Sequence, residues 1–573
     1  MRSVIKYLYP YRRRMTLGFS IKVVSTMIEL FIPYILSHIL KNIVSRENVW
    51  EIISWGAVMI LCAASACVGN ITANRMAARV SANFSREMRM ALFSKTLELS
   101  AARVDKFTIP SLESRITTDT YNVHNFVSMM QRMGVRAPIL LLGGISITLI
   151  MDRRLALVMI AVLPFIFVTV YFISRKGVPL YRGVQRSVDD MVRVVREDSQ
   201  GIRVIKALSK NDYENRRYDK VNSKLSKDER HAGIIMGSVN PIMTLLMNLG
   251  IIGVVGLSAY LVSSGKSSPE TIVAFMQYFT LISMAMMSIS RIFVMYTKCA
   301  ASARRIAEVL DVENEIKVER SELGEKNENA YISFKNVNFS YLKGGKNLEN
   351  VTFSLEKGKS LGIIGATGSG KSTLVRLLMR FYDADEGEIY IGGRNVKEYE
   401  KGELSSLFGV ALQNDFIYSD TISENIRFGR EVSDEDVVRA AKIAQAHDFI
   451  TAFENGYDHV LSQKGTNVSG GQKQRILIAR AVAARPEILI LDDSSSALDY
   501  KTDANLRKAL LEELGETTLV TVAQRVSSVK NCDLILVIDE GKISAMGTHD
   551  ELMEISEEYR EIADSQMGGA FVE

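Results

Sequence analysis

The stretch GATGSGKST, residues 365–373, combines the residue types that bind phosphate groups. It fits the pattern G-x-x-x-x-G-K-[ST], in which glycines let backbone N–H groups curl around phosphates. Lys371 supplies a positive charge to the phosphate oxygens, and the Ser372 hydroxyl is a ligand type for Mg²⁺. The stretch therefore predicts a loop that binds the phosphates of a nucleotide.

Two adjacent carboxylates follow a second apolar run, ILILDDSSSALD, residues 488–499. Asp492, at the end of a buried strand, would make an ordinary cation ligand, because hard cations prefer oxygen ligands. One acid at the end of a buried strand is enough for that task. The role of Asp493 therefore depends on the other motifs of the chain.

A third motif, VSGGQKQR at 468–475, precedes the helical run ILIARAVAA. Ser469, Gly470 and Gly471 are predicted to form a helix N-terminus, where unpaired backbone N–H groups attract anions. Like the first two motifs, this one is suited to phosphate chemistry.

Strands and helices that could position these motifs alternate along the second half of the chain. The strand-like run SLGII precedes the glycine-rich loop and the helical run STLVRLLMRF follows it, which is the context that a phosphate loop requires. EILILDD and TLVTVA are further strand-like runs, separated by the helical NLRKALLEEL. This alternation predicts an α/β domain with a largely parallel sheet.

The first half of the chain contains apolar runs long enough to cross a bilayer, which takes about 20 residues. Four of them lack Asp, Glu, Lys, Arg and His: 52–74, 155–173, 241–262 and 271–290. Two weaker candidates are 15–36, interrupted by Lys22 and Glu29, and the shorter 137–151. We predict an α-helical membrane domain of six spans.

Lys and Arg are concentrated in three segments of this first half: 2–14, 75–115 and 175–230. By the positive-inside rule these segments are cytoplasmic, so both termini are expected inside. The last two segments are helical in pattern, and we expect them to continue membrane helices into the cytosol. Each has a break, at 101–107 and 209–214, which we expect to act as a coupling helix.

The overall composition sets further limits. The 573 residues are 47% hydrophobic with a net charge of +5, and the basic residues lie in blocks without interleaved aromatics, so no nucleic-acid partner is expected. The cysteines have neither metal-ligand nor disulfide spacing: Cys62, Cys67, Cys299 and Cys532. The predicted domains are a membrane domain at 1–310, a polar linker at 311–329 and a nucleotide-binding domain at 330–573.

Taken together, the phosphate loop, ILILDD and VSGGQ resemble the ATP-binding cassette (ABC) family, whose signature is usually LSGGQ. With six preceding spans, the chain resembles a type IV ABC exporter half-transporter. The resemblance implies ATP and Mg²⁺ as cofactors, a lipid bilayer as surroundings and a second half-transporter as partner. It also implies a multi-pass protein of the plasma membrane, which in a bacterium is the inner membrane.

The resemblance also implies roles for individual residues. Tyr341 would stack on adenine, unless it is a plain strand tyrosine, and Gln413 would reach Mg²⁺, unless it is a solvated loop amide. The ATP-binding set is Tyr341, Gly365, Thr367, Gly368, Ser369, Gly370, Lys371, Ser372, Thr373, Ser469, Gly470, Gly471 and Gln472. The Mg²⁺ set is Ser372, Gln413 and Asp492. Of the ATP-binding set, Ser469 and its neighbours in the signature would face the partner's ATP.

Two positions depart from the family pattern, in which Glu follows the Mg²⁺-binding Asp and a His lies about thirty residues later. Here they are Asp493 and Gln524. Asp is one methylene shorter than Glu, which withdraws its carboxylate by roughly 1 Å and can cost on the order of 10²-fold in rate. Gln cannot become cationic as His can. We expect ATP binding to persist and hydrolysis at this site to be weak.

The signature VSGGQ is intact and would serve the partner's ATP, whereas Asp493 and Gln524 would make this chain's own site weak. This combination favours an asymmetric dimer of two different chains, and a homodimer is the alternative. The resemblance is thus to a subunit of a heterodimeric bacterial multidrug exporter with a degenerate ATP site. The cargo would be lipophilic compounds, lipids or peptides. An ATP-gated channel or regulatory subunit, and an importer on the same fold, are the other functions considered.

Several charged residues lie at membrane depth. Lys22 and Glu29 are seven residues apart on one helical face, and Arg132, Arg136 and Arg291 lie near the ends of spans. Such residues face a cavity or pair with each other. The first arrangement predicts contact with a polar or anionic cargo. The second, with mutual pairing or snorkelling, is the commoner one.

Overall fold

The computed structural model describes residues 2–46, 48–264, 270–313, 318, 330–341, 344–345, 347–413, 416–494 and 496–567. The chain divides into two units. The first comprises Met1–Leu97 and Pro110–Val312, and the second Glu98–Ile109 and Glu313–Glu573. Most of the predicted linker, 311–329, lies outside the described residues.

Within the described residues, six helical segments are long and apolar enough to cross a membrane, which confirms the predicted number. They are Ser3–Ile43, Val49–Glu98, Ile109–Met151, Arg153–Ala207, Asn211–Ser263 and Thr271–Leu310. All are about twice the length that a bilayer requires, so the apolar runs continue into polar helical extensions as expected.

The elements of the first unit are almost entirely helical. They are α1 (Arg2–Ile5), η1 (Lys6–Tyr11), α2 (Arg12–His38), η2 (Ile39–Ile43), η3 (Val44–Arg46), α3 (Val49–Glu98), α5 (Ile109–Ser114), η4 (Arg115–Asp119), α6 (Thr120–Met129), η5 (Met130–Gly134), α7 (Val135–Met151), α8 (Arg153–Ala207), α9 (Asn211–Gly237), α10 (Val239–Ser263) and α11 (Glu270–Leu310). The third span contains two π-helical turns, η4 and η5.

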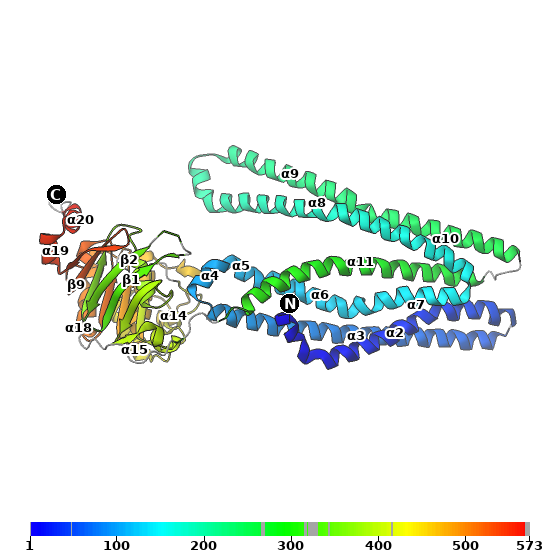
Figure 1. The fold of residues 1–573 in the computed structure, drawn as a ribbon, viewed down its shortest axis with the longest axis horizontal. Helices are drawn as coiled ribbons and strands as arrows, with labels where there is room; N and C mark the ends of the chain where they lie inside the picture. The colour runs from blue at the N-terminus through cyan, green and yellow to red at the C-terminus, as the bar shows by residue number, and fades with distance from the viewer. Residues whose placement is uncertain are drawn as a thin grey trace. The chain divides into compact units, whose positions relative to one another are not determined.

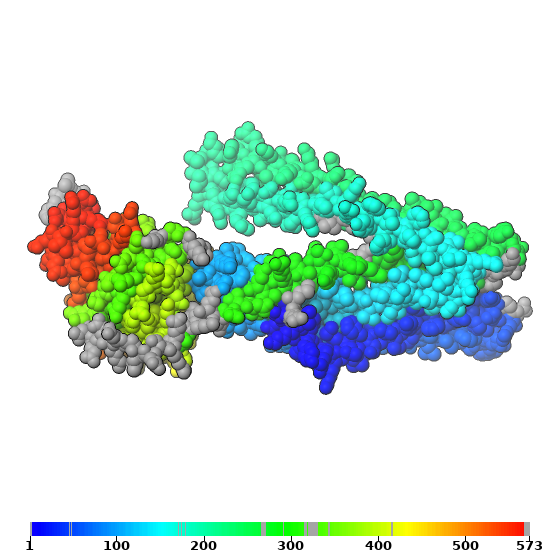
Figure 2. Space-filling view, in the orientation of Figure 1, coloured from blue at the N-terminus to red at the C-terminus, as the bar shows by residue number. Residues whose placement is uncertain are grey.

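Close packing joins some spans of this unit and leaves others apart. α7 packs on α2 and α11, where a Cβ added to Gly144 would lie 2.8 Å from Ile282, and the buried Tyr278 hydroxyl donates to the Leu30 carbonyl at 2.6 Å. α8 packs mainly along α9 and α10, and it also contacts α7 (Figure 1). In the space-filling view the α8–α9 hairpin stands apart from α11 over much of its length (Figure 2). Only Leu225 and Ala232 of α9 are buried.

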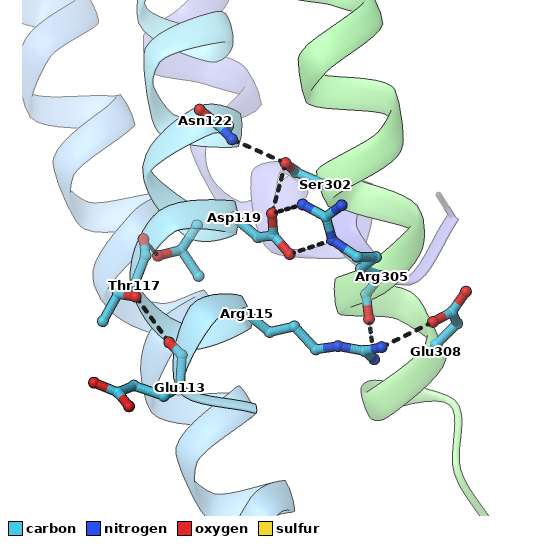
Figure 3. A network of polar contacts seen from close by, with 9 residues as sticks. Glu113, Arg115, Thr117, Asp119, Asn122, Ser302, Arg305 and Glu308 are labelled. Atoms are coloured by element: carbon cyan, nitrogen blue, oxygen red, sulfur yellow. Dashed lines mark hydrogen bonds and ion pairs between the residues drawn. The ribbon is translucent and has the colours of Figure 1, made fainter. Parts of the chain in front are cut away.

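A polar clasp links the third span to α11 (Figure 3). Asp119, at the end of η4, is fully buried and accepts bonds from both the Arg305 guanidinium and the Ser302 hydroxyl. Arg115 donates to the Arg305 carbonyl at 2.8 Å and to Glu308 at 3.1 Å. Buried charges require such pairing, so the clasp fixes the register between these helices.

The second unit contains two sheets. An antiparallel sheet has the order β2-β1-β4-β5, from β1 (Ile332–Phe339), β2 (Leu348–Leu355), β4 (Glu386–Ile391) and β5 (Arg394–Asn395). The other has the order β10-β9-β3-β8-β7-β6, from β3 (Ser360–Ile364), β6 (Phe408–Ala411), β7 (Ile488–Asp492), β8 (Thr518–Val522), β9 (Leu534–Asp539) and β10 (Lys542–Gly547). In it, all neighbouring strands except β10 and β9 are parallel, as expected. The antiparallel sheet was not predicted.

Helices complete this α/β unit. They are α12 (Lys371–Leu378), α13 (Lys401–Ser406), α14 (Ile422–Arg427), α15 (Asp434–Ile443), α16 (His447–Thr451), α17 (Gly470–Ala483), α18 (Tyr500–Glu513), α19 (His549–Ile555) and α20 (Glu557–Met567). The helix after the phosphate loop is shorter than the sequence pattern indicated, because it ends at Leu378.

The two predicted coupling helices differ in structure. At the first break, α4 (Ala101–Phe107) is a separate helix capped by the Ser100 hydroxyl, and it belongs to the second unit. The second break contains no separate helix, because α8 ends at Ala207 and α9 begins at Asn211. The intervening turn includes Ser209 with a φ of 51°.

Candidate nucleotide-binding site

The phosphate loop connects β3 to α12, as the sequence pattern requires. Gly365, Gly368 and Gly370 have φ values of 153°, 87° and 112°, which side-chain-bearing residues rarely adopt. A Cβ on Gly365 would lie only 2.1 Å from the Ile538 carbonyl oxygen of β9. Glycine is therefore needed both for the turn and for its close approach to the sheet.

Lys371 is the first residue of α12, and its side chain folds back over the loop. Its Nζ donates to the carbonyls of Gly365 and Ala366, at 2.8 and 2.7 Å. Burial lowers the pKa of Lys371, while the charges of Asp492 and Asp493 oppose this shift. The loop thus holds the ammonium group where phosphate oxygens can replace the carbonyl partners.

The hydroxyl and carboxylate expected to hold Mg²⁺ lie together. The Ser372 hydroxyl donates to Asp492 Oδ1 at 3.3 Å. Asp492 ends the buried strand β7, and burial raises its pKa against the effect of the Ser372 bond. The Ser369 hydroxyl is buried and has no hydrogen-bond partner among the described residues. An unsatisfied hydroxyl in the loop fits a phosphate oxygen, so these residues suit Mg²⁺ and a nucleotide.

Asp493 is held by two amides from neighbouring strand ends. Gln413 Nε2 and Gln524 Nε2 each donate to Asp493 Oδ2 at 3.1 Å. β6, β7 and β8 are adjacent parallel strands, so the residues just beyond their carboxyl ends meet at one edge of the sheet. Burial raises the pKa of Asp493, and the Gln413 bond opposes the rise.

Most of the predicted site lines one pocket. The predicted residues in its lining are Thr367, Gly368, Gly370, Lys371, Ser372, Thr373, Gln413, Asp492, Asp493 and Gln524. Asn347, Val522 and Ala523 also line it and were not predicted. Asn347 accepts a hydrogen bond from the Tyr341 backbone N–H at 2.9 Å. It lies in a loop before β2, without a local motif that could have indicated its role.

Tyr341 lies beside the end of the phosphate loop. Its hydroxyl donates to Thr373 Oγ1 at 3.3 Å and accepts from Arg376 at 3.2 Å. Tyr382 packs edge-on against the Tyr341 ring, with centroids 5.1 Å apart, and its hydroxyl donates to Asp105 of α4 at 2.5 Å. The sequence did not indicate the contacts of Arg376 and Tyr382, because both residues lie far from Tyr341 along the chain.

The signature residues do not line the pocket that contains the chain's own phosphate loop. Ser469 caps α17: its hydroxyl accepts from the Gln472 N–H at 3.3 Å, and Gln472 Oε1 accepts from the Ser469 N–H at 3.0 Å. Nothing lies within 4 Å of a Cβ built on Gly470, and a Cβ on Gly471 would lie 3.1 Å from the Ala497 carbonyl. The result is an exposed, well-formed helix N-terminus.

Sequence comparison identifies the class to which this fold and site belong. Residues 15–286 match the family described as ABC transporter transmembrane region, and residues 348–496 match the family described as ABC transporter. The chain belongs to the ABC transporter family.

Several relatives match along the whole chain. The uncharacterized ABC transporter ATP-binding protein YfiB of Bacillus subtilis is 34% identical over 570 residues, covering 99% of each chain. YknU of the same organism is 34% identical over 566 residues, covering 98% of this chain and 96% of the relative. Rv1273c of Mycobacterium tuberculosis is 30% identical over 573 residues, covering 99% and 98%.

A solved structure of a bacterial Atm1-family ABC exporter with ATP bound has the same fold. The TM-score is 0.82 at 23% identity, over 98% of this chain and 99% of the other. The chain therefore has an ABC exporter-type transporter fold with an ATP-binding domain.

Proposed function

We propose that this chain is one subunit of a heterodimeric, ATP-driven exporter of lipophilic compounds, lipids or peptides, and that its own ATP site hydrolyses slowly. The proposed location is a bacterial inner membrane, with both termini cytoplasmic. The exporter-type fold supports the transport direction. The observation that carries the asymmetry is the carboxylate of Asp493, one oxygen of which accepts from both Gln413 and Gln524.

The surroundings of Asp493 favour binding over chemistry. A base acting on water must present an oxygen to that water, and one of the two oxygens of Asp493, Oδ2, already accepts hydrogen bonds from two amides. Gln524 adds a neutral amide where a cationic imidazole would stabilise developing phosphate charge. Bound Mg²⁺ would supply neutralisation of phosphate charge, held by Ser372 and Asp492 with Gln413. The loop residues that bind phosphate keep the conformation they need.

The signature motif supports a role toward a partner. The capping box of Ser469 and Gln472 leaves the remaining N–H groups of the first turn of α17 exposed, and such groups bind anions. The α8–α9 hairpin, which stands apart from α11 over much of its length and buries only Leu225 and Ala232 of α9, also leaves a long helical surface for a second subunit. We expect that subunit to carry Glu and His at the positions equivalent to Asp493 and Gln524.

The test of asymmetry is steady-state ATPase activity of purified complexes. We expect a heterodimer to hydrolyse ATP, Asp493→Asn to change its rate less than twofold, and Ser469→Arg to abolish most turnover by placing bulk against the partner's γ-phosphate. Lys371→Ala is expected to weaken nucleotide retention more than turnover. A homodimer with a typical rate of about 10 per second, silenced by Asp493→Asn, would show that the chain hydrolyses ATP by itself.

The transport activity needs a separate measurement. We expect ATP-dependent accumulation of a fluorescent lipophilic dye in inside-out vesicles that contain the complex. Vesicles with Lys371→Ala in this chain and the equivalent substitution in the partner provide the control. An ATP-gated ionic current without accumulation would support a channel instead.

A further inference from the structure

Four charged side chains within the membrane-spanning helices form a cluster. Lys22 and Glu29 belong to α2, Arg132 to η5 and Arg136 to α7. The charges of Glu29, Arg132 and Arg136 all act on Lys22, so the four groups form one electrostatic unit.

The pairing within this cluster is unequal. Arg136 donates twice to Glu29, from Nη2 at 2.6 Å and from Nε at 3.3 Å. Lys22 is buried and donates to the neutral amide oxygens of Asn70 and Asn74 on α3, at 2.8 and 3.1 Å.

Arg132 is exposed, and only its Nε donates, to the Ser128 carbonyl at 3.3 Å. Among the described residues, Glu29 is the only carboxylate whose charge acts on Lys22. Three cations against one carboxylate leave an excess of positive charge.

An excess of positive charge at this depth needs a counter-charge. A cation that faces hydrocarbon is costly, and membrane charges usually face a cavity or an opposite charge. Arg132 and Arg136 are four residues apart and thus share one side of the helix. Within the described structure, the terminal nitrogens of Arg132 make no hydrogen bond. A guanidinium fork of this kind fits the two oxygens of a carboxylate or phosphate.

The position of the cluster along the spans indicates what kind of anion could reach it. Asn70 and Asn74 close the apolar run 52–74, and Arg136 directly precedes the apolar run 137–151. The adjoining segments are the basic ones that the positive-inside rule assigns to the cytoplasm. A molecule with an anionic head and an apolar tail could place its head at the cluster and its tail among the spans.

We propose that Arg132 and Arg136, with the charge of Lys22, bind the phosphate or carboxylate head of an anionic amphiphile as cargo. Without the anion, Arg136 pairs with Glu29; when the anion binds, it takes the place of Glu29 as the partner of Arg136. A cationic compound would meet three like charges and is selected against. That the bound anion is exported cargo rests on the proposed export function. Binding of the anion itself requires neither ATP nor its hydrolysis.

The test is direct binding of radiolabelled dodecyl phosphate to the full-length transporter in a neutral maltoside detergent without ATP. We expect saturable binding that dodecanoate displaces and dodecyltrimethylammonium does not. Arg132→Gln should weaken binding about tenfold, since one charge-assisted pair is lost. The matched control is Arg154→Gln, which removes an exposed guanidinium beyond Asp152 and should leave the affinity unchanged.

Further competition experiments identify the source of the anion, and a second variant keeps the test valid if the first one misfolds. Displacement by phosphatidylglycerol but not phosphatidylcholine in nanodiscs indicates a membrane lipid, whereas displacement by dodecanoate alone indicates a free amphiphile. If Arg132→Gln fails to fold, Arg132→Lys keeps the charge but not the fork, and an intermediate loss is expected. Equal binding of the cationic amphiphile, or an unchanged affinity in whichever Arg132 variant folds, overturns the proposal. A transporter that binds dodecyl phosphate as expected but lacks ATPase activity would contradict the proposed export function and not the proposed anion site.

Discussion

Asp493 lies where the chain has the least freedom to compensate for a shorter side chain. Its backbone φ of 51° is unusual for a residue other than glycine, and the adjacent Asp492 ends a fully buried strand. Two glutamine amides donate hydrogen bonds to one oxygen of this carboxylate. Asp493 and Gln524, the two positions that depart from the pattern implied by the family resemblance, thus meet at the same oxygen.

Restoring both groups should restore chemistry. We expect Asp493→Glu with Gln524→His to raise the ATPase rate of a homodimer of this chain by about 10²-fold, because the base regains its reach and the imidazole can carry a charge. Steady-state ATPase measures the gain, and adding Lys371→Ala should remove it. An unchanged ATPase rate in a double variant that still binds ATP would mean that Asp493 and Gln524 do not limit hydrolysis.

The raised pKa of Asp492 predicts a pH dependence of Mg²⁺ binding. Because burial raises its pKa, Asp492 keeps its proton to a higher pH in the folded, metal-free protein than in the unfolded chain, so stability falls as the pH rises through the raised pKa. Mg²⁺ binds the ionised carboxylate. As the pH falls, the stabilisation by Mg²⁺ should therefore be lost at a higher pH than it would be with an ordinary aspartate.

Thermal unfolding with and without Mg²⁺ and ATP, between about pH 7.5 and about pH 5, measures this effect. Asp492→Asn should raise the midpoint of the metal-free protein at neutral pH and remove most of the Mg²⁺-dependent shift. A shift independent of both pH and the substitution would contradict the assignment of Asp492 as a metal-holding residue.

Among the elements, the clasp between η4 and α11 is predicted to stabilise the first unit. Asp119→Asn removes the charge of a fully buried group that faces Arg305, and we expect a loss of about 2 kcal/mol in the free energy of unfolding. Glu113→Gln is the matched control, because Glu113 lies exposed on α5 of the same span (Figure 3).

That control should change the free energy by less than about 0.5 kcal/mol. Denaturation in detergent micelles measures both variants. Equal losses would show that the clasp contributes nothing beyond surface charge.

Sequence reasoning succeeded where the chemistry is local. The strand, glycine-rich loop and helix around residues 365–373 were predicted correctly, because the glycines and Lys371 act through the backbone on either side of them. The convergence of Gln413 and Gln524 on one oxygen depends on the register of β6, β7 and β8, which no local pattern encodes. The antiparallel sheet was also missed: β5, Arg394–Asn395, is too short to show alternation, and β1 pairs with β4 across a long stretch of sequence.

At the scale of the whole molecule, α4 connects membrane-spanning helices yet belongs to the nucleotide-binding unit. We propose that it acts as a coupling helix, partly through the bond from Tyr382 to Asp105. Tyr382→Phe should remove this bond while keeping the ring against Tyr341, and amide hydrogen exchange in 101–107 should become up to about tenfold faster.

Tyr390→Phe is the control, because the Tyr390 hydroxyl bonds to Glu388 within β4. Mass-spectrometric hydrogen exchange of the full chain measures both variants. Unchanged exchange at 101–107 in Tyr382→Phe would mean that other contacts hold α4.

The membership of α4 in the second unit has a consequence for the order in which the protein is made. Tyr382 lies 277 residues after Asp105, so a ribosome needs on the order of tens of seconds to make the surface on which α4 docks. During that interval the side of α4 that contacts Tyr382 stays exposed, while the neighbouring spans enter the membrane. A chain that stops before the nucleotide domain would expose this side permanently, which makes α4 a natural mark of an unfinished molecule.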